Sequence, residues 1–225
     1  DFGLKMPSEP VSVLSKTAVQ KSADVQATQT HYLFTCGPVD LKLTFSAPLF
    51  LEDLDLVSRP VNYISYEAVS NDGNKHDVGI YFEASPRWAS DKNWQETVSE
   101  TYTKDGLVYL KAGTKSQEIL AKKGDDLRID WGYFYLAADA DKMDAGVGKA
   151  IDLRNCFKEG GRLSEIGVKG ENSEGRLSMS REHGKAKTAA GSVMIGYDDI
   201  CSIQYFGENL RPYWNADGKS SIEEQ

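Results

Sequence analysis

The chain of 225 residues has few of the side chains from which metal centres and catalytic triads are built. It contains three cysteines and three histidines, and none stands at the spacing of a metal-ligand motif. No Gly-x-Ser-x-Gly nucleophile elbow is present either. Three cysteines are too few for a disulfide scaffold, so Cys36 and Cys201 are predicted to be buried free thiols, although one cysteine pair could bridge in an oxidising compartment. The sequence therefore predicts no catalytic residue, no metal and no cofactor.

Long apolar runs and basic runs are also missing. No run approaches the roughly 18 apolar residues that a membrane-spanning helix needs, so no membrane span is predicted. No signal peptide stands at the start, but the sequence begins with Asp1 rather than methionine, so this absence says nothing about the parent protein. The 34 acidic and 26 basic residues give a net charge of −8, which repels phosphate backbones, and nucleic acid is not an expected partner.

What the sequence does have is a regular two-residue alternation between residues 39 and 86. Val39 and every second residue to position 45 are apolar, with polar residues between them. Similar runs at 63–69 and 78–84 are separated by Asn-Asp-Gly-Asn at 71–74, which tolerates the positive φ of a chain reversal. Because alternate side chains of a strand point to opposite faces, these runs predict the spine of an antiparallel sheet.

Further strand patterns follow at short spacing. Asp105-Gly106 between alternating runs predicts a β-hairpin over residues 98–112. Residues 126–138 predict another strand, in which Gly132 marks a bulge or a close backbone approach. Roughly ten to thirteen strand candidates with little helix predict an all-β fold rather than an α/β fold. We expect a large antiparallel β-sandwich, supersandwich-like, with few short helices.

The pattern divides the chain into three parts. Residues 1–24 are polar with two prolines and are predicted to form an irregular lead-in, followed by the β-sandwich over residues 25–214. Residues 215–225 are predicted to be a linker and the start of a helix, because Ser220 and Ser221 each have a glutamate three residues on, the pattern of a capping box. The chain stops inside that helix, which suggests a module cut from a longer protein with a helical domain next.

The candidate ligand-binding residues are Trp88 and Trp94, which lie in a polar loop. An aromatic face suits the C–H groups of a pyranose ring, so the pair could form a sugar-stacking platform. The alternative, which the sequence favours, is that they cap the end of the sandwich or pack on a neighbouring domain. The acidic run at 139–146 partly follows a calcium loop, but it lacks the glutamate at position twelve, so a polar turn is favoured over a metal site.

Several segments of the chain resemble the glutaminase A family of fungal and bacterial secreted proteins. The most specific is Asp-Leu-Asp-Leu-Val-Ser-Arg-Pro at residues 53–60, and the similarity covers most of residues 20–218. The other matching segments are at residues 25–45, 61–66, 70–73, 76–78, 81–85, 131–137 and 210–214. The matching part of the family is the β-rich region that precedes a helical-toroid domain.

This resemblance implies that the parent protein hydrolyses L-glutamine to glutamate and ammonia and is exported to the periplasm or the outside. It also implies that the catalytic groups lie on the helical domain, so no catalytic residue can be carried onto this chain. We therefore expect a non-catalytic N-terminal module whose partner is the C-terminal helical domain of the same polypeptide, which it buttresses. The alternative is a carbohydrate-binding accessory module of a glycoside-hydrolase-like protein.

Overall fold

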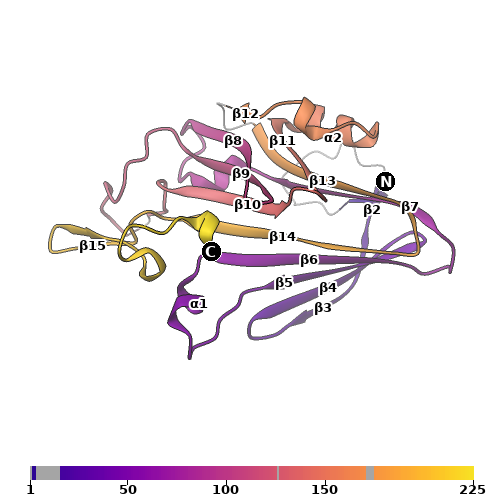
Figure 1. The fold of residues 1–225 in the computed structure, drawn as a ribbon, viewed down its shortest axis with the longest axis horizontal. Coiled ribbons are helices and arrows are strands. Elements are labelled where there is room, and N and C mark those ends of the chain that lie inside the picture. The colour runs from indigo at the N-terminus through magenta and orange to yellow at the C-terminus, as the bar shows by residue number, and fades with distance from the viewer. Residues whose placement is uncertain (1, 4–15, 126, 171–174) are drawn as a thin grey trace. The chain divides into compact units, whose positions relative to one another are not determined.

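The computed structural model describes residues 2–3, 16–125, 127–170 and 175–225. Within these ranges the regular structure is mostly β-strands in antiparallel sheets, with two short α-helices, α1 (Leu54–Ser58) and α2 (Ala150–Lys158) (Figure 1). The predicted all-β, sandwich-like fold with few short helices is confirmed. No helix in the described part of the chain is long and apolar enough to cross a membrane.

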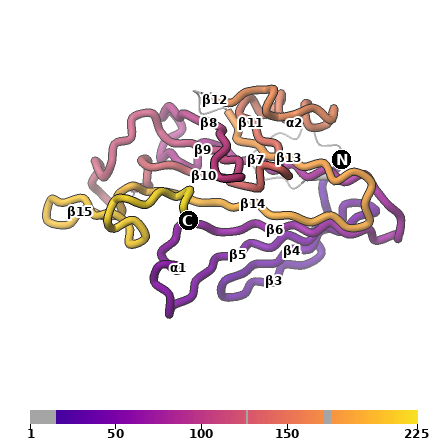
Figure 2. Tube along the Cα trace, viewed as in Figure 1, coloured from indigo at the N-terminus to yellow at the C-terminus, as the bar shows by residue number. Residues whose placement is uncertain are grey.

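The chain forms two compact units. The first unit comprises residues 1–47, 63–80 and 181–193, and the second comprises residues 48–62, 81–180 and 194–225. Four strands, labelled along the chain trace in Figure 2, contribute residues to both units: β6 (Val61–Ser70), β7 (His76–Ala84), β13 (Gly175–Ala186) and β14 (Thr188–Asp198). Each unit is therefore built from segments that are distant in the sequence.

In the first unit the hydrogen-bonded order is β3-β4-β5-β6. The three outer strands are β3 (Val19–Val25), β4 (Gln29–Cys36) and β5 (Val39–Ser46), and a parallel pair, β1 (Phe2–Gly3) with β2 (Lys16–Thr17), precedes them. The alternation in β5 has the predicted effect, because Leu41 stands opposite Ala68 of β6 and packs with Val78 and Ala189 in the core. This core lies between two layers of strands.

Two features of the first unit differ from the sequence prediction. The expected lead-in over residues 1–24 contains most of strand β3, whose side chains are all exposed, so it carries no apolar alternation that could have revealed it. The chain reverses at residues 71–74, but β6 and β7 do not pair with each other. β6 lies beside β5, whereas β7 belongs to the three-stranded sheet β11-β13-β7, so the turn joins two layers.

In the second unit the order β12-β8-β9-β10 leads to β14. These strands are β12 (Lys169–Gly170), β8 (Thr97–Lys104), β9 (Leu107–Thr114) and β10 (Tyr133–Asp139). The predicted hairpin is confirmed: Asp105 and Gly106 have φ of 50° and 80°, the two positive values that a tight type I′ turn needs. Strand β11 (Asp144–Lys149) packs over β8 and β9, with α2 beside it, so this unit also has two layers (Figure 1).

The strand predicted over residues 126–138 begins only at Tyr133, in β10. Residue 126 lies outside the described part, and residues 127–132 form no strand. Leu127 and Ile129 are exposed rather than on a buried face. Gly132, with φ of 78°, turns the chain into β10 and lies against the carbonyl of Asp198, so the predicted close approach is confirmed. Alternation by itself does not separate a paired strand from an extended loop.

The C-terminal part leaves the sheets. A small hairpin, β15 (Ile203–Tyr205) with β16 (Glu208–Leu210), is followed by 3-10 turns at Tyr213–Asn215 and Ile222–Glu224. The predicted capping box forms at Ser221 with Glu224, where the helix is a single 3-10 turn. The limits of the predicted sandwich, residues 25 and 214, and of the following linker stay a prediction.

Candidate functional site

The segment Ser85 to Gln95, here called the tryptophan loop, presents large aromatic side chains to solvent. It begins with a 3-10 turn, Pro86–Ala89, in which the Ser85 hydroxyl accepts a hydrogen bond from the backbone of Arg87. Ala89 is fully buried, so the turn is packed on the second unit. Trp88 and Trp94 are 63% and 79% exposed, which is unusual for the residue type with the most apolar area to lose from water.

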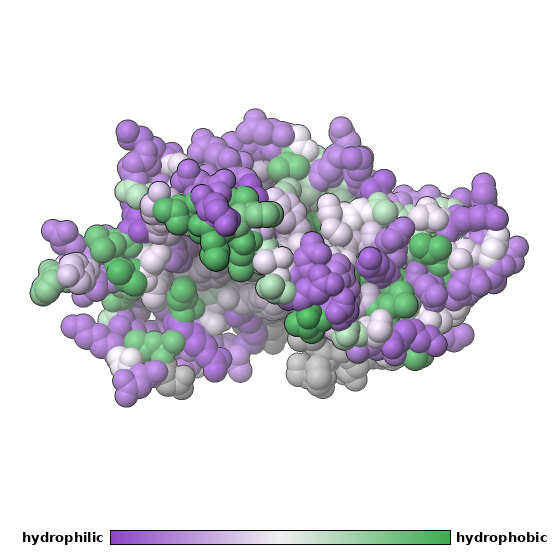
Figure 3. All heavy atoms as spheres, turned by 90° about the horizontal axis from the view of Figure 1, so that it is seen from below, coloured by the Kyte–Doolittle hydropathy of each residue, from purple (hydrophilic) through white to green (hydrophobic). Residues whose placement is uncertain are grey.

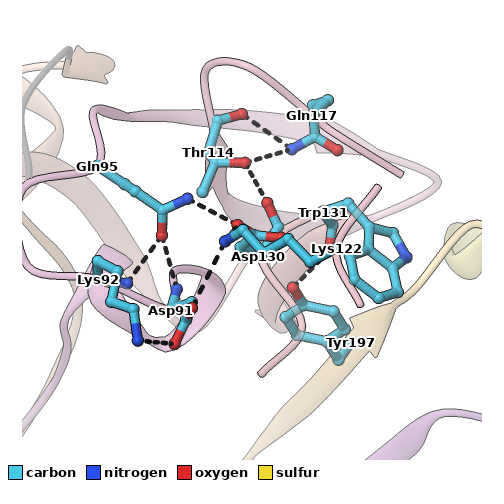
Figure 4. Close-up of polar contacts among 9 residues, drawn as sticks. All are labelled: Asp91, Lys92, Gln95, Thr114, Gln117, Lys122, Asp130, Trp131 and Tyr197. Atoms are coloured by element: carbon cyan, nitrogen blue, oxygen red, sulfur yellow. Dashed lines mark hydrogen bonds and ion pairs between the residues drawn. The ribbon is translucent and has the colours of Figure 1, made fainter. Parts of the chain in front are cut away.

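A buried glutamine holds this loop in one conformation (Figure 4). The side-chain oxygen of Gln95 accepts hydrogen bonds from the backbone nitrogens of Asp91 and Lys92, at 2.9 and 2.8 Å. Its nitrogen donates to Oδ2 of the buried Asp130 at 2.8 Å. The guanidinium of Arg87 also donates to the backbone oxygen of Asn93 at 2.8 Å. The loop is therefore fixed from both of its ends.

Lys122 links two carboxylates in the same network. Its ammonium group bonds to Oδ2 of Asp130, which is only 1% exposed, and lies 3.5 Å from Oδ2 of Asp91. The hydrogen bond to Asp130 raises the pKa of Lys122 above its ordinary value of 10.5, against the effect of desolvation. Burial by itself would raise the pKa of Asp91, but the hydrogen bonds and charges of Lys92 and Lys122 outweigh it and lower the pKa below 3.8.

These two pKa shifts define the pH range over which the network stabilises the folded protein. Asp91 contributes stability that is present above pH 3.8 and is lost as the pH falls through its lowered folded-state pKa. Lys122 contributes stability that is present below pH 10.5 and is lost as the pH rises through its raised folded-state pKa. Around neutral pH both groups are charged, so the loop is held by its full set of ion pairs.

A second loop, between β9 and β10, supports Asp130. Gln117 has a positive φ of 46°, a conformation that costs energy for a residue with a side chain. Its amide offsets this cost by donating to the oxygens of Thr114 and Gly132, at 2.9 and 3.0 Å, and by accepting from the nitrogen of Gly132 at 2.7 Å. The Thr114 hydroxyl donates to the backbone oxygen of Asp130 (Figure 4). Asp130 is thus positioned by its backbone as well as its side chain.

The indole of Trp88 packs against a buried side chain. Its ring lies 5.5 Å from the ring of the buried Phe134, centroid to centroid, so this side of the indole is packed while the rest faces water. The other two tryptophans of the chain, Trp131 and Trp214, are buried. The two candidates chosen from the sequence therefore stand on one loop, and they are the two exposed tryptophans of the chain.

The arrangement is suited to binding by surface contact. Asp91, Lys122 and Asp130 are engaged with one another, so they are not presented as an acid–base pair to a substrate. Among the residues that the structure describes, no group of three metal-ligating side chains comes together. Sequence reasoning missed Gln95, Lys122 and Asp130, because they meet only through the fold and no local pattern distinguishes them from surface polar residues.

The network predicts that Asp130→Asn lowers the free energy of unfolding by about 2–3 kcal/mol, because an amide cannot balance the charge of Lys122. Urea denaturation at neutral pH measures this change. Asp125→Asn, an exposed aspartate of the same connecting segment, is the matched control and should change stability by less than about 0.5 kcal/mol. Equal effects of the two substitutions would show that the network does not stabilise the fold.

Comparison with known proteins shows which family the sequence of this chain matches. The family model "Domain of unknown function (DUF5127)" matches residues 28–225. Glutaminase A of Aspergillus oryzae is 28% identical over 200 residues, which cover 85% of this chain and 29% of that protein. The resemblance to glutaminase A is therefore confirmed, and the chain spans less than a third of this relative's length.

Solved structures give a weaker likeness. Heparan sulfate lyase HepC from Pedobacter heparinus is 11% identical with a TM-score of 0.41, and the match covers 82% of this chain and 22% of the lyase. A likeness of this size carries no argument about function. The sequence match, which spans nearly the whole chain, shows that the chain belongs to the DUF5127 domain family.

Proposed function

We propose that this chain is the non-catalytic N-terminal β-sandwich module of an exported glutaminase-like hydrolase and that it buttresses a helical domain of the same polypeptide. The relationship to glutaminase A, of which the chain covers 29%, supports a role as one part of a longer protein. The hydrolysis of L-glutamine would then belong to the rest of the polypeptide. The module would supply a rigid docking surface.

The observation that carries this proposal is an exposed apolar segment at residues 49–54. Leu49, Phe50, Leu51 and Leu54 are all exposed, and Leu51 is 80% exposed. Figure 3, which views the molecule from below Figure 1, shows apolar atoms gathered on the side where α1 lies. Such a cluster of leucine and phenylalanine side chains is typical of a surface that is covered in the complete protein.

The position of this segment suggests which partner covers it. The segment ends at Leu54, the first residue of helix α1, and this helix packs against the turn Tyr213–Asn215. Arg59, at the end of α1, donates to the backbone oxygen of Gln225 at 2.8 Å, and the Tyr102 hydroxyl donates to Glu223 at 2.5 Å. The apolar segment and residues 213–225 thus belong to one bonded region. A helical domain that follows these residues in a longer polypeptide would therefore begin beside α1, the helix that contains Leu54.

Leu51→Glu tests this docking surface in the longest polypeptide that the gene encodes. We expect the substitution to separate a single thermal transition into two, because a charge at the interface opposes docking. Val25→Glu, at an equally exposed apolar residue of β3, is the control and should leave one transition. The 225-residue chain by itself should not hydrolyse L-glutamine. Turnover by this chain, or the same melting curve for both variants, contradicts the proposal.

A further inference from the structure

The tryptophan loop and the apolar segment 49–54 differ in what surrounds their exposed side chains. In the apolar segment three apolar side chains, Leu49, Phe50 and Leu51, follow one another without a break, and Glu52 and Asp53 come only before Leu54. In the tryptophan loop, by contrast, four polar residues at positions 90–93 separate the two indoles, and Lys92 and Asn93 are exposed. Such a surface suits a ligand that has apolar faces and polar edges rather than a wholly apolar partner.

The loop is also organised before any ligand arrives. Because Arg87 precedes Trp88 and Asn93 precedes Trp94, the 2.8 Å bond from the Arg87 guanidinium to the Asn93 oxygen ties together the backbone next to both indoles. Gln95 and Asp130 hold the same turn from beneath. A site that is already ordered loses little conformational entropy on binding, so even a shallow aromatic surface can give measurable affinity.

The two indoles offer the kind of contact that sugar rings need. Trp88 is packed against Phe134 on one side and is 63% exposed overall, so it stands as a fixed aromatic surface. Trp94 is still more exposed, at 79%. The axial C–H groups of a β-linked hexopyranose form a flat apolar face, while its hydroxyl groups project from the ring edge. Stacking of that face on an indole leaves the hydroxyl groups free for polar side chains.

We propose that the tryptophan loop binds neutral polysaccharide chains of β-linked hexopyranose units. The sugar faces stack on Trp88 and Trp94, and the side chains of Lys92 and Asn93 supply hydrogen bonds to hydroxyl groups. A neutral polymer is favoured because the chain carries a net charge of −8, which repels sulfated or uronic-acid polymers. This binding goes beyond the docking role at residues 49–54 and does not depend on it.

Affinity electrophoresis of the 225-residue chain tests the proposal, with hydroxyethylcellulose and mixed-linkage β-glucan in the gel and alginate as the anionic comparison. We expect retardation by the neutral polymers and none by alginate. Trp94→Ala should weaken the retardation at least about tenfold, the loss typical of truncating a hot-spot aromatic residue. Phe206→Ala, at a 91% exposed aromatic residue of the β15–β16 turn, is the matched control and should be retarded like the original chain.

Intrinsic fluorescence gives a second readout. Because Trp131 and Trp214 are buried, an emission change on titration with cellohexaose should come from the exposed pair and should be lost in Trp94→Ala. Trp94→Ala is the decisive variant, since Trp88 also packs on Phe134 and its removal disturbs the fold. The proposal fails if no neutral glycan binds, if Phe206→Ala loses as much binding as Trp94→Ala, or if Trp94→Ala weakens only the docking of a helical domain. None of these results changes what Leu51→Glu reports.

Discussion

Glu83→Gln is expected to lower the free energy of unfolding by about 3–5 kcal/mol, the cost of removing one member of a buried ion pair. Glu83, in β7, binds two arginines from other elements of the second unit. Arg154 of α2 donates from Nε and Nη2 to its two oxygens, at 2.9 and 2.5 Å, and Nε of Arg176 in β13 lies 3.2 Å from Oε1. All three side chains are mostly buried.

The size of this effect follows from what the substitution leaves behind. A glutamine can accept one hydrogen bond from Arg154, but it cannot balance the charge of either guanidinium inside the protein. The hydroxyl of Tyr81 also donates to Glu83, at 2.8 Å. Burial and the charge of Glu83 raise the pKa of Tyr81, so this hydroxyl stays a donor around neutral pH and loses its best acceptor in the variant.

Glu96→Gln is the control for this prediction. Glu96 also forms an ion pair, with Lys115 at 3.3 Å, but both side chains are largely exposed. Exposed pairs contribute less than about 1 kcal/mol, because water and salt screen them. Urea denaturation and thermal melting should therefore separate the two variants, by roughly 2–4 °C for each kcal/mol. A Glu83→Gln protein as stable as Glu96→Gln would mean that the arginines find other partners at no cost.

Gly132→Ala is expected to destabilise the second unit by about 2–5 kcal/mol, the other large effect. Two costs add at this position. A φ of 78° is strained for a residue with a Cβ, which costs about 1–2 kcal/mol. The added Cβ would also collide with the backbone oxygen of Asp198 and stand 3.0 Å from the Cα of Asp199. A backbone contact cannot relax as a flexible side chain can, so overpacking adds about 1–3 kcal/mol.

Gly106→Ala separates the cost of backbone strain from the cost of the steric overlap. Gly106 has nearly the same φ, 80°, but a Cβ there would meet nothing within 4 Å. This variant should therefore show the backbone strain alone, about 1–2 kcal/mol. The difference between the two variants, measured by urea denaturation, reports the close approach of Gly132 to Asp198. A difference near zero would place the whole effect in the backbone conformation.

The strands could be predicted from the sequence wherever their pattern is local. The alternation at residues 39–45 and the Asp105-Gly106 turn each depend on a few neighbouring residues, and the structure confirms both. The prediction was wrong where the local pattern and the strand do not coincide. Residues 127–132 alternate like a strand but form an irregular loop, and β3 lacks the alternation although it is a paired strand.

Only part of the candidate site could be predicted from the sequence, for the same reason. Trp88 and Trp94 could be chosen because aromatic residues in a polar loop stand out in a sequence. Their support could not, because Gln95, Lys122 and Asp130 are ordinary polar residues until the fold places them together. The loop is stabilised by bonds to residues up to 35 positions away along the chain.

The sequence by itself determined that this protein is an all-β domain with a relationship to glutaminase A, because a period of two is a property of each strand alone and the matching segments are contiguous. Only the tertiary structure decided that β6 and β7 lie in different layers, that the tryptophans stand on a rigid loop, and that residues 49–54 are uncovered. Hydrogen-bond partners and burial depend on residues far apart in the chain, and a local pattern does not contain that information.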